Sequence, residues 1–207
     1  MLGRVRDLAE KIRADGLAPT LRRVREIARD AIVPPWNTIY WLNAREVVRI
    51  PPVSGARLRV VHRLEELGED ERRDLTASIG TSAMPLVEQR LLQGVELHLL
   101  LVDEKVAGTR FVVFGSSHPF QNVVLTARDT MGLDVRIDPR FRGSGLAPLF
   151  FSLSIAELAE RGIERIFAAA SVHNDRSNRT LVRVGFQPLL RYREKRGIYR
   201  YDRKPLA

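Results

Sequence analysis

The clearest periodic pattern in the chain runs from residue 133 to residue 159. It starts with apolar residues at alternate positions, the two-residue period of a strand: Leu133, Val135 and Ile137. Apolar residues then recur every three or four positions between residues 146 and 156, which is the period of a helix. Pro139 ends the strand, because proline has no N–H to donate to a sheet. The pattern therefore predicts a strand, a loop and a helix in direct succession.

The loop between this strand and this helix contains Gly143 and Gly145 and begins at Arg142. The first turn of a helix has backbone N–H groups without partners and the positive end of the helix dipole, so such a loop suits a phosphate or pyrophosphate. It is not a P-loop, because Leu146-Ala147 stand where that loop has lysine followed by serine or threonine. It also lacks the third glycine or alanine of a dinucleotide-binding fingerprint.

A second strand and a second helix follow. Gly162 ends the first helix, and residues 163–170 form a short apolar run typical of a buried strand. Asn174 can then begin another helix, which Gly185-Phe186 ends.

Two motifs in this region resemble those of the GNAT superfamily of acyl-CoA-dependent acyltransferases. The first is Arg-x-x-Gly-x-Ala after a strand that ends in Val-Arg-Ile-Asp-Pro: Arg142, Gly145 and Ala147. The second is Asn-x-x-Ser followed by apolar residues and Gly-Phe: Asn174, Ser177, Leu181 and Gly185-Phe186. The resemblance extends over about residues 56–203 as an architecture. It implies an α+β (α/β) fold with flanking helices and a central mixed, mostly antiparallel sheet that splays at the CoA site.

For the site, the resemblance implies acetyl-CoA or another acyl-CoA as co-substrate. The glycine loop would hold the pyrophosphate through backbone N–H groups, assisted by the side chain of Arg142. The pantetheine arm would enter the gap between the strand of residues 133–137 and that of residues 166–168. The residues expected to bind the coenzyme are Val135, Ile137, Arg142, Gly143, Ser144, Gly145, Leu146, Ala147, Asn174 and Ser177.

The sequence departs from the family where relatives carry their proton donors and acceptors. Many relatives have a tyrosine seven residues after the asparagine, where this chain has Leu181, and the glutamate of others aligns near Met131. The remaining candidates for catalysis are Asp134, His118 and His173. A water chain, or an amine that arrives deprotonated, would also serve.

Composition narrows the chemistry further. The 207 residues include no cysteine, which excludes thiol catalysis, disulfides and thiolate metal sites. The four histidines are scattered, so we expect no metal. No apolar run reaches the roughly 18 residues of a membrane span, and the N-terminus lacks a signal-peptide core. We therefore expect a cytoplasmic protein, with a position at the inner face of the membrane as an alternative.

The net charge of +9 belongs to the two ends of the chain. Residues 1–50 contain ten Lys/Arg and six Asp/Glu, and residues 187–207 contain seven and two. Residues 51–186 contain seventeen of each and are neutral. The basic surface is therefore predicted outside the catalytic core.

The N-terminal segment lies outside the resemblance. Amphipathic helices are predicted over residues 2–14 and 20–32, followed by an aromatic cluster: Trp36, Tyr40 and Trp41. A boundary is indicated by Pro51-Pro52 and Ser54-Gly55, so we expect a basic helical extension over residues 1–54 and a GNAT domain over residues 55–207. The extension would pack on the core or on a second copy of the chain, as in a homodimer. Alternatively, it would lie on a membrane or dock an acidic partner.

The rest of the chain shows shorter periodic patterns. A strand is expected at residues 58–60, and helices at 68–75 and 84–92. Strands at 95–102 and 106–114 would form a hairpin in which His98 is half-buried. The segment 115–129 would either cover the acceptor pocket or be a surface loop. The tail suggests a strand from residue 187, a basic turn at 191–196 and a last strand at 198–201.

The leading hypothesis is an N-acyltransferase that uses acyl-CoA, acetyl-CoA first among them, and a small-molecule amine as acceptor. A second hypothesis is a long-chain acyltransferase that takes its acyl group from acyl carrier protein or acts at a membrane surface, since basic chain ends suit an acidic partner. A third is a nucleic-acid-binding protein, but the interspersed acidic residues and the lack of a recognisable motif argue against it.

Overall fold

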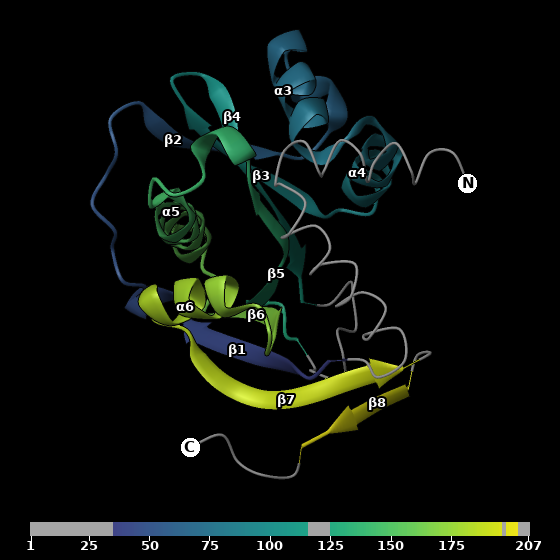
Figure 1. The fold of residues 1–207 in the computed structure, drawn as a ribbon, viewed down its shortest axis with the longest axis vertical. Helices are drawn as coiled ribbons and strands as arrows, with labels where there is room; N and C mark the ends of the chain where they lie inside the picture. Colours follow the sequence, from purple (N-terminus) through teal and green to yellow (C-terminus); the bar gives the residue numbers. More distant parts are fainter. Residues whose placement is uncertain (1–34, 116–124, 196–197, 203–207) are drawn as a thin grey trace, which may run out of the picture.

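The computed structural model describes residues 35–115, 125–195 and 198–202 (Figure 1). Its strands are β1 (Asn37–Asn43), β2 (Ala56–Val61), β3 (Glu96–Val102), β4 (Lys105–Phe114), β5 (Asp129–Ile137), β6 (Arg165–Ser171), β7 (Gln187–Lys195) and β8 (Ile198–Tyr201). Its α-helices are α3 (Glu69–Ile79), α4 (Met84–Leu92), α5 (Leu146–Glu160) and α6 (Asp175–Arg183).

The described strands form one mixed sheet in the order β2-β3-β4-β5-β6-β1-β7-β8. Only β5 and β6 pair in parallel, and all other neighbours are antiparallel. This confirms the predicted fold class. The helices predicted over residues 2–14 and 20–32 lie outside the described residues.

The centre of the sheet is the β5–α5–β6 unit that the periodic pattern predicted. β5 begins earlier than expected, at Asp129, because its first four residues pair with β6. This parallel ladder ends at Gly132 opposite Ala168. Beyond Gly132 the two strands have no further paired residues, so the splay between them begins there. Asp134 has a positive φ of 49° just after this point, where the pairing of β5 with β4 also shifts its register.

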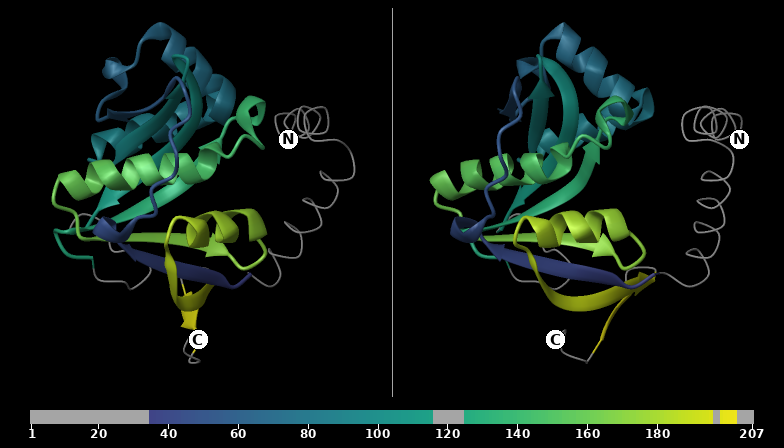
Figure 2. Two further views of the ribbon diagram at one scale, coloured as in Figure 1. Left: turned by 90° about the vertical axis from the view of Figure 1, so that its left-hand side faces the viewer. Right: turned by 60° about the vertical axis from the view of Figure 1, so that its left-hand side comes forward.

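Helices cover both faces of the sheet (Figures 1 and 2). α5 and α6 lie on one face, whereas α3 and α4 pack on the other, against β2, β3 and β4. The connection from β1 to β2 crosses the outer side of α5, where the N–H of Ile50 donates to Ser152 Oγ at 3.2 Å. α5 is therefore enclosed between the sheet and this connection, which explains why it buries nine of its fifteen residues.

β1 corrects the prediction for the N-terminal segment. The sequence placed residues 36–41 in the extension, but β1 lies inside the sheet, antiparallel to both β6 and β7. Ile39 is fully buried and Tyr40 nearly so, because both faces of β1 are covered. A strand covered on both faces has no alternation of polar and apolar residues, so the sequence pattern does not mark β1 as a strand. The boundary expected at residues 54–55 therefore does not separate this strand from the sheet, since Pro51-Pro52 belong to the connection over α5.

Two helices after β2 and a β3–β4 hairpin are confirmed, with Asp103 and Glu104 at its turn. His98 is completely buried, not half-buried, because α5 covers it. The basic turn expected at residues 191–196 is wrong for residues 191–195, which the structure describes as a strand. Arg191 to Lys195 continue β7, in which Tyr192 is buried opposite Asn37 of β1.

Candidate functional site

The loop after β5 is anchored by a buried carboxylate. Asp138 is 3% exposed and accepts hydrogen bonds from the backbone N–H of Arg140 at 2.8 Å and from its guanidinium at 3.0 Å. Burial alone would raise the pKa of Asp138, but these bonds from Arg140 outweigh it and hold the pKa below its usual value. The backbone N–H of Asp138 also bonds to the carbonyl of Ala107 on β4. The loop therefore leaves the sheet at a fixed point.

The loop ends at the open N-terminus of α5. Gly145 takes the N-cap position with a left-handed φ of 75°, and no described side chain caps the helix. A Cβ added at Gly143 or Gly145 would meet no described atom within 4 Å. Leu146 and Ala147 are in the first turn of α5, where backbone N–H groups have no partner within the helix, as an anion-binding helix end requires.

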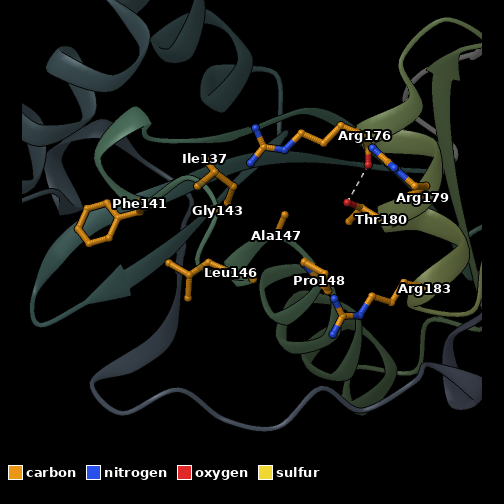
Figure 3. Close-up of a pocket in the computed structure, with 11 residues that line it drawn as sticks. Ile137, Phe141, Gly143, Leu146, Ala147, Pro148, Arg176, Arg179, Thr180 and Arg183 are labelled. Atoms are coloured by element: carbon orange, nitrogen blue, oxygen red, sulfur yellow. Dashed lines mark hydrogen bonds between the residues drawn. The ribbon is translucent and has the colours of Figure 1, made fainter. Parts of the chain in front are cut away.

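A first cavity, the loop pocket, lies between this loop, the first turn of α5 and α6 (Figure 3). Its α6 side carries three exposed arginines spaced three and four residues apart: Arg176, Arg179 and Arg183. The guanidinium of Arg176 extends towards Gly143, and that of Arg183 lies beside Pro148 (Figure 3). No carboxylate of the described residues forms an ion pair with any of the three. The pocket thus combines unpaired cations with a free helix N-terminus.

A second cavity, the splay pocket, lies where β5 and β6 separate. Its inner end includes Gly132 of β5, Phe151 of α5 and Ala168 of β6. It shares Ile137, Ala147, Arg176 and Thr180 with the loop pocket, so the two cavities form one groove.

The groove brings together most of the predicted coenzyme-binding residues. Gly143, Gly145 and Leu146 line the loop pocket, whereas the splay pocket is lined by Val135, Ile137, Arg142, Ala147, Asn174 and Ser177. Ser144 lines neither, because its hydroxyl turns back to donate to the carbonyl of Phe141. Asn174 is the N-cap of α6 and its Oδ1 accepts from the N–H of Ser177 at 3.2 Å. Their part in binding a coenzyme stays a prediction.

The three candidate proton carriers are not brought together. Asp134 lines the splay pocket, but Arg90 of α4 holds its carboxylate with an N–O distance of 2.6 Å. His173 is exposed and lines neither cavity. His118 lies outside the described residues.

Sequence reasoning missed the arginines of α6 and the ring of Phe151. The spacing of Arg176, Arg179 and Arg183 was a visible signal, because residues three and seven positions apart share a helix face. Nothing local indicated that this face meets the glycine loop. Among residues 35–115, 125–195 and 198–202, no cluster of three or more histidine or acidic residues could hold a metal, and no helix is long and apolar enough to cross a membrane.

Comparison with known proteins decides the family. The model of the acetyltransferase (GNAT) family matches residues 64–186, which is more than half of the chain. The chain belongs to the GNAT acetyltransferase family. No curated protein sequence matches it significantly.

Solved structures share the GNAT fold at low sequence identity. A GNAT-family acetyltransferase from Colwellia psychrerythraea aligns with a TM-score of 0.55 and 11% identity, over 74% of this chain and 53% of that one. A GCN5-related N-acetyltransferase from Kribbella flavida aligns with a TM-score of 0.51 and 16% identity, over 78% and 60% of the two chains. A glucosamine N-acetyltransferase region of a fungal multi-domain β-N-acetylglucosaminidase aligns with a TM-score of 0.57 and 12% identity, over 86% of this chain and 23% of that one. The chain thus spans 60% or less of the length of each of these three proteins.

Proposed function

We propose that this GNAT protein transfers an acyl group, acetyl first among them, from coenzyme A to an amine. The observation that carries the proposal is the single groove that joins the N-terminus of α5 and the arginines of α6 to the splay between β5 and β6. A long ligand with phosphates at one end and a reactive group at the other suits such a groove.

The loop pocket suits the phosphates of coenzyme A. The pyrophosphate would accept hydrogen bonds from the N–H groups of Leu146 and Ala147 at the start of α5. Arg176 and Arg179 stand opposite, where they can contact the same phosphates or the phosphate on the ribose. Each charge-assisted hydrogen bond of this kind contributes about 1.5–3 kcal/mol.

The splay pocket suits the pantetheine arm and the acyl group. Between Leu133 and Ile137 the edge of β5 that faces β6 has no partner in the parallel ladder. Its backbone N–H and C=O groups can therefore pair with the amides of a ligand, as an added strand would. A pantetheine arm bound in this way would have its thioester near Gly132, where the parallel ladder begins.

In the proposed reaction the amine nitrogen attacks the carbonyl carbon of the thioester. The N–C bond forms, the C–S bond breaks, and the coenzyme A sulfur leaves with the electron pair and takes up the proton that the amine loses. Asp134 is the only carboxylate or imidazole among the described residues that line the groove, and Arg90 engages it. We therefore propose that the amine arrives deprotonated or loses its proton to water.

A thermal-shift titration with acetyl-CoA, free CoA and a long-chain acyl-CoA tests the proposal. Each coenzyme that binds should raise the melting temperature of the wild type. Gly145→Glu should abolish the rise, because it adds an anion to the anion site. Gly162→Glu is the matched control at the other end of α5, since its φ is also positive, 86°, and a Cβ there also meets no described atom within 4 Å.

The outcome separates the alternative donors. If none of the coenzymes shifts the transition, the CoA proposal fails and an acyl carrier protein is the next donor to test. If one binds, release of its thiol in the presence of a panel of amines identifies the acceptor.

A further inference from the structure

Arg110 of β4 is a buried cation without a counter-ion among the described residues. Its side chain is 0% exposed, and within the described part of the chain it makes one hydrogen bond, from Nη1 to Ser154 Oγ at 3.0 Å. Nε and Nη2 are buried without partners among the described residues. The guanidinium lies over the ring of Phe151, 4.8 Å from its centre. The buried carboxylate of Glu96 on β3 is held by Arg161 and so does not neutralise it.

This arrangement is costly. Burying an ion without a partner costs several kcal/mol of desolvation free energy, even after the protein relaxes. Buried polar atoms in native proteins are also almost always hydrogen-bonded. Burial lowers the pKa of Arg110 to about 10, which leaves it charged at neutral pH. Buried uncompensated charges are typical of functional sites, where local stability is sacrificed for an electrostatic effect.

The cation lies directly behind the inner end of the splay pocket. A Cβ added to Gly132 would be 2.3 Å from Nη2, 2.5 Å from Nε and 2.8 Å from Cζ of Arg110. The guanidinium therefore fills the space that a side chain at 132 would need, and it turns the edge with its two unpaired nitrogens towards Gly132. Both residues that it contacts here, Gly132 and Phe151, also line the splay pocket.

We propose that Arg110 is a positioning residue that imposes a positive potential on the inner end of the splay pocket and thereby stabilises the thiolate of coenzyme A. The inference rests on the proposed function, which places the thioester at this end. There the C–S bond breaks and the electron pair stays on sulfur until the proton from the amine reaches it. A fixed cation in a low-dielectric wall acts on such a charge without contact and without reorganisation.

The other titratable groups around Arg110 and the splay pocket are neutral, paired or exposed. His98 of β3 is buried beside Ser154, and burial lowers its pKa, which favours the neutral form. The remaining ones are paired or exposed: Glu96 with Arg161, Asp134 with Arg90, and Arg136, Arg142 and Arg176 at the pocket rim. Only Arg110 combines complete burial with an unneutralised charge among the described residues.

The decisive experiment measures the pKa of the thiol of bound coenzyme A from its thiolate absorbance during a pH titration, with the protein saturated. The chain has no cysteine, so the coenzyme carries the only thiol in the sample. The wild type should bind CoA with a thiol pKa below that of free CoA in the same buffer. Arg110→Met should raise the bound pKa by about one unit, and Arg110→Lys should restore much of the difference.

Arg128→Met is the matched control, because it removes the same charge from an exposed arginine that pairs with Glu164. It should leave the bound thiol pKa unchanged. The measurement is repeated in about 1 M salt, where the Debye length is about 3 Å and exposed arginines are screened. The effect of Arg110 should persist there.

Each outcome decides the inference. If the wild type binds CoA but Arg110→Met has the same bound thiol pKa, the inference is wrong and the proposed function stands. If CoA does not bind at all, both fall. Arg110→Met should fold, because replacing a buried charge by an apolar residue of similar size is often neutral or stabilising. Should it not fold, a wild-type thiol pKa that equals that of free CoA at high salt overturns the inference.

Discussion

At the scale of single residues, three charged or titratable side chains are buried beneath α5: Glu96, His98 and Arg110. Glu96 is 5% exposed and accepts hydrogen bonds from Arg161 at 2.6 and 2.8 Å and from the Nε2 of His98 at 3.2 Å. Burial by itself would raise the pKa of Glu96, but the bonds from His98 and Arg161 outweigh it and lower the pKa to about 2. One carboxylate therefore ties β3 to the end of α5.

This carboxylate should make the protein sensitive to acid. The pKa of Glu96 falls from 4.5 in the unfolded chain to about 2 in the folded one, so its contribution to stability is complete above pH 4.5 and is lost as the pH falls towards 2. We expect a contribution of roughly 3 kcal/mol to the free energy of unfolding. Urea unfolding between pH 6 and pH 2 measures it, and Glu96→Gln should flatten the decline. An equally steep decline in the variant would assign the acid sensitivity to other groups.

At the scale of elements, α6 is the part of the site that combines a structural and a binding role. Its N-terminus is capped by Asn174, and Asn178 joins it to the sheet by accepting from the hydroxyl of Tyr40 at 3.0 Å. Leu181 is its buried residue, so the arginines are left on the side that faces the glycine loop. The cap and the buried contact thus aim the cations at the loop pocket.

The arginines of α6 should account for much of the affinity for coenzyme A. Arg176→Gln and Arg179→Gln should each weaken binding several-fold, because each removes a cation that has no other described partner. The double variant should also show a weaker dependence of affinity on salt, since exposed charges are screened. Titration calorimetry at two salt concentrations measures both effects. Arg73→Gln on α3, which is exposed and paired with Asp70, is the control.

Comparing CoA with dephospho-CoA in the same titrations locates the contact. If the arginines bind the ribose phosphate, the variants and the wild type should bind dephospho-CoA equally well. Affinity for CoA that is unaffected by either substitution would exclude α6 from the phosphate site.

At the scale of the whole molecule, β1 joins β7 and β8 to the rest of the described sheet. It pairs with β6 on one side and with β7 on the other, so among the described strands it is the link between β6 and the C-terminal pair. The connection that follows β1 then covers α5. Residues 35–54 are thus part of the fold that positions the site.

Ile39→Ala tests this place of β1. Ile39 is 0% exposed and packs with Met131 of β5 and Phe167 of β6. Truncating it should lower the free energy of unfolding by about 2–5 kcal/mol in one cooperative transition. Val53→Ala, at a side chain that is 40% exposed, should change it little. If Ile39→Ala left the global transition unchanged, β1 would be an accessory strand.

The sequence by itself determined the centre of the fold and of the site. The strand, the glycine loop, α5, β6 and the start of α6 could be predicted because each depends on neighbours within a few positions. Such local patterns include the alternation of Leu133, Val135 and Ile137, the missing side chain at Gly145 and the cap at Asn174.

Only the tertiary structure decided how distant residues meet. The aromatic segment around Tyr40 has no polar alternation, because β1 is covered on both faces, so its pairing between β6 and β7 left no local signal. In the same way, Arg110 resembles any polar residue in a strand until α5 covers it and Gly132 makes room for its guanidinium. Burial and charge balance depend on which elements pack together, and that is a property of the folded chain as a whole.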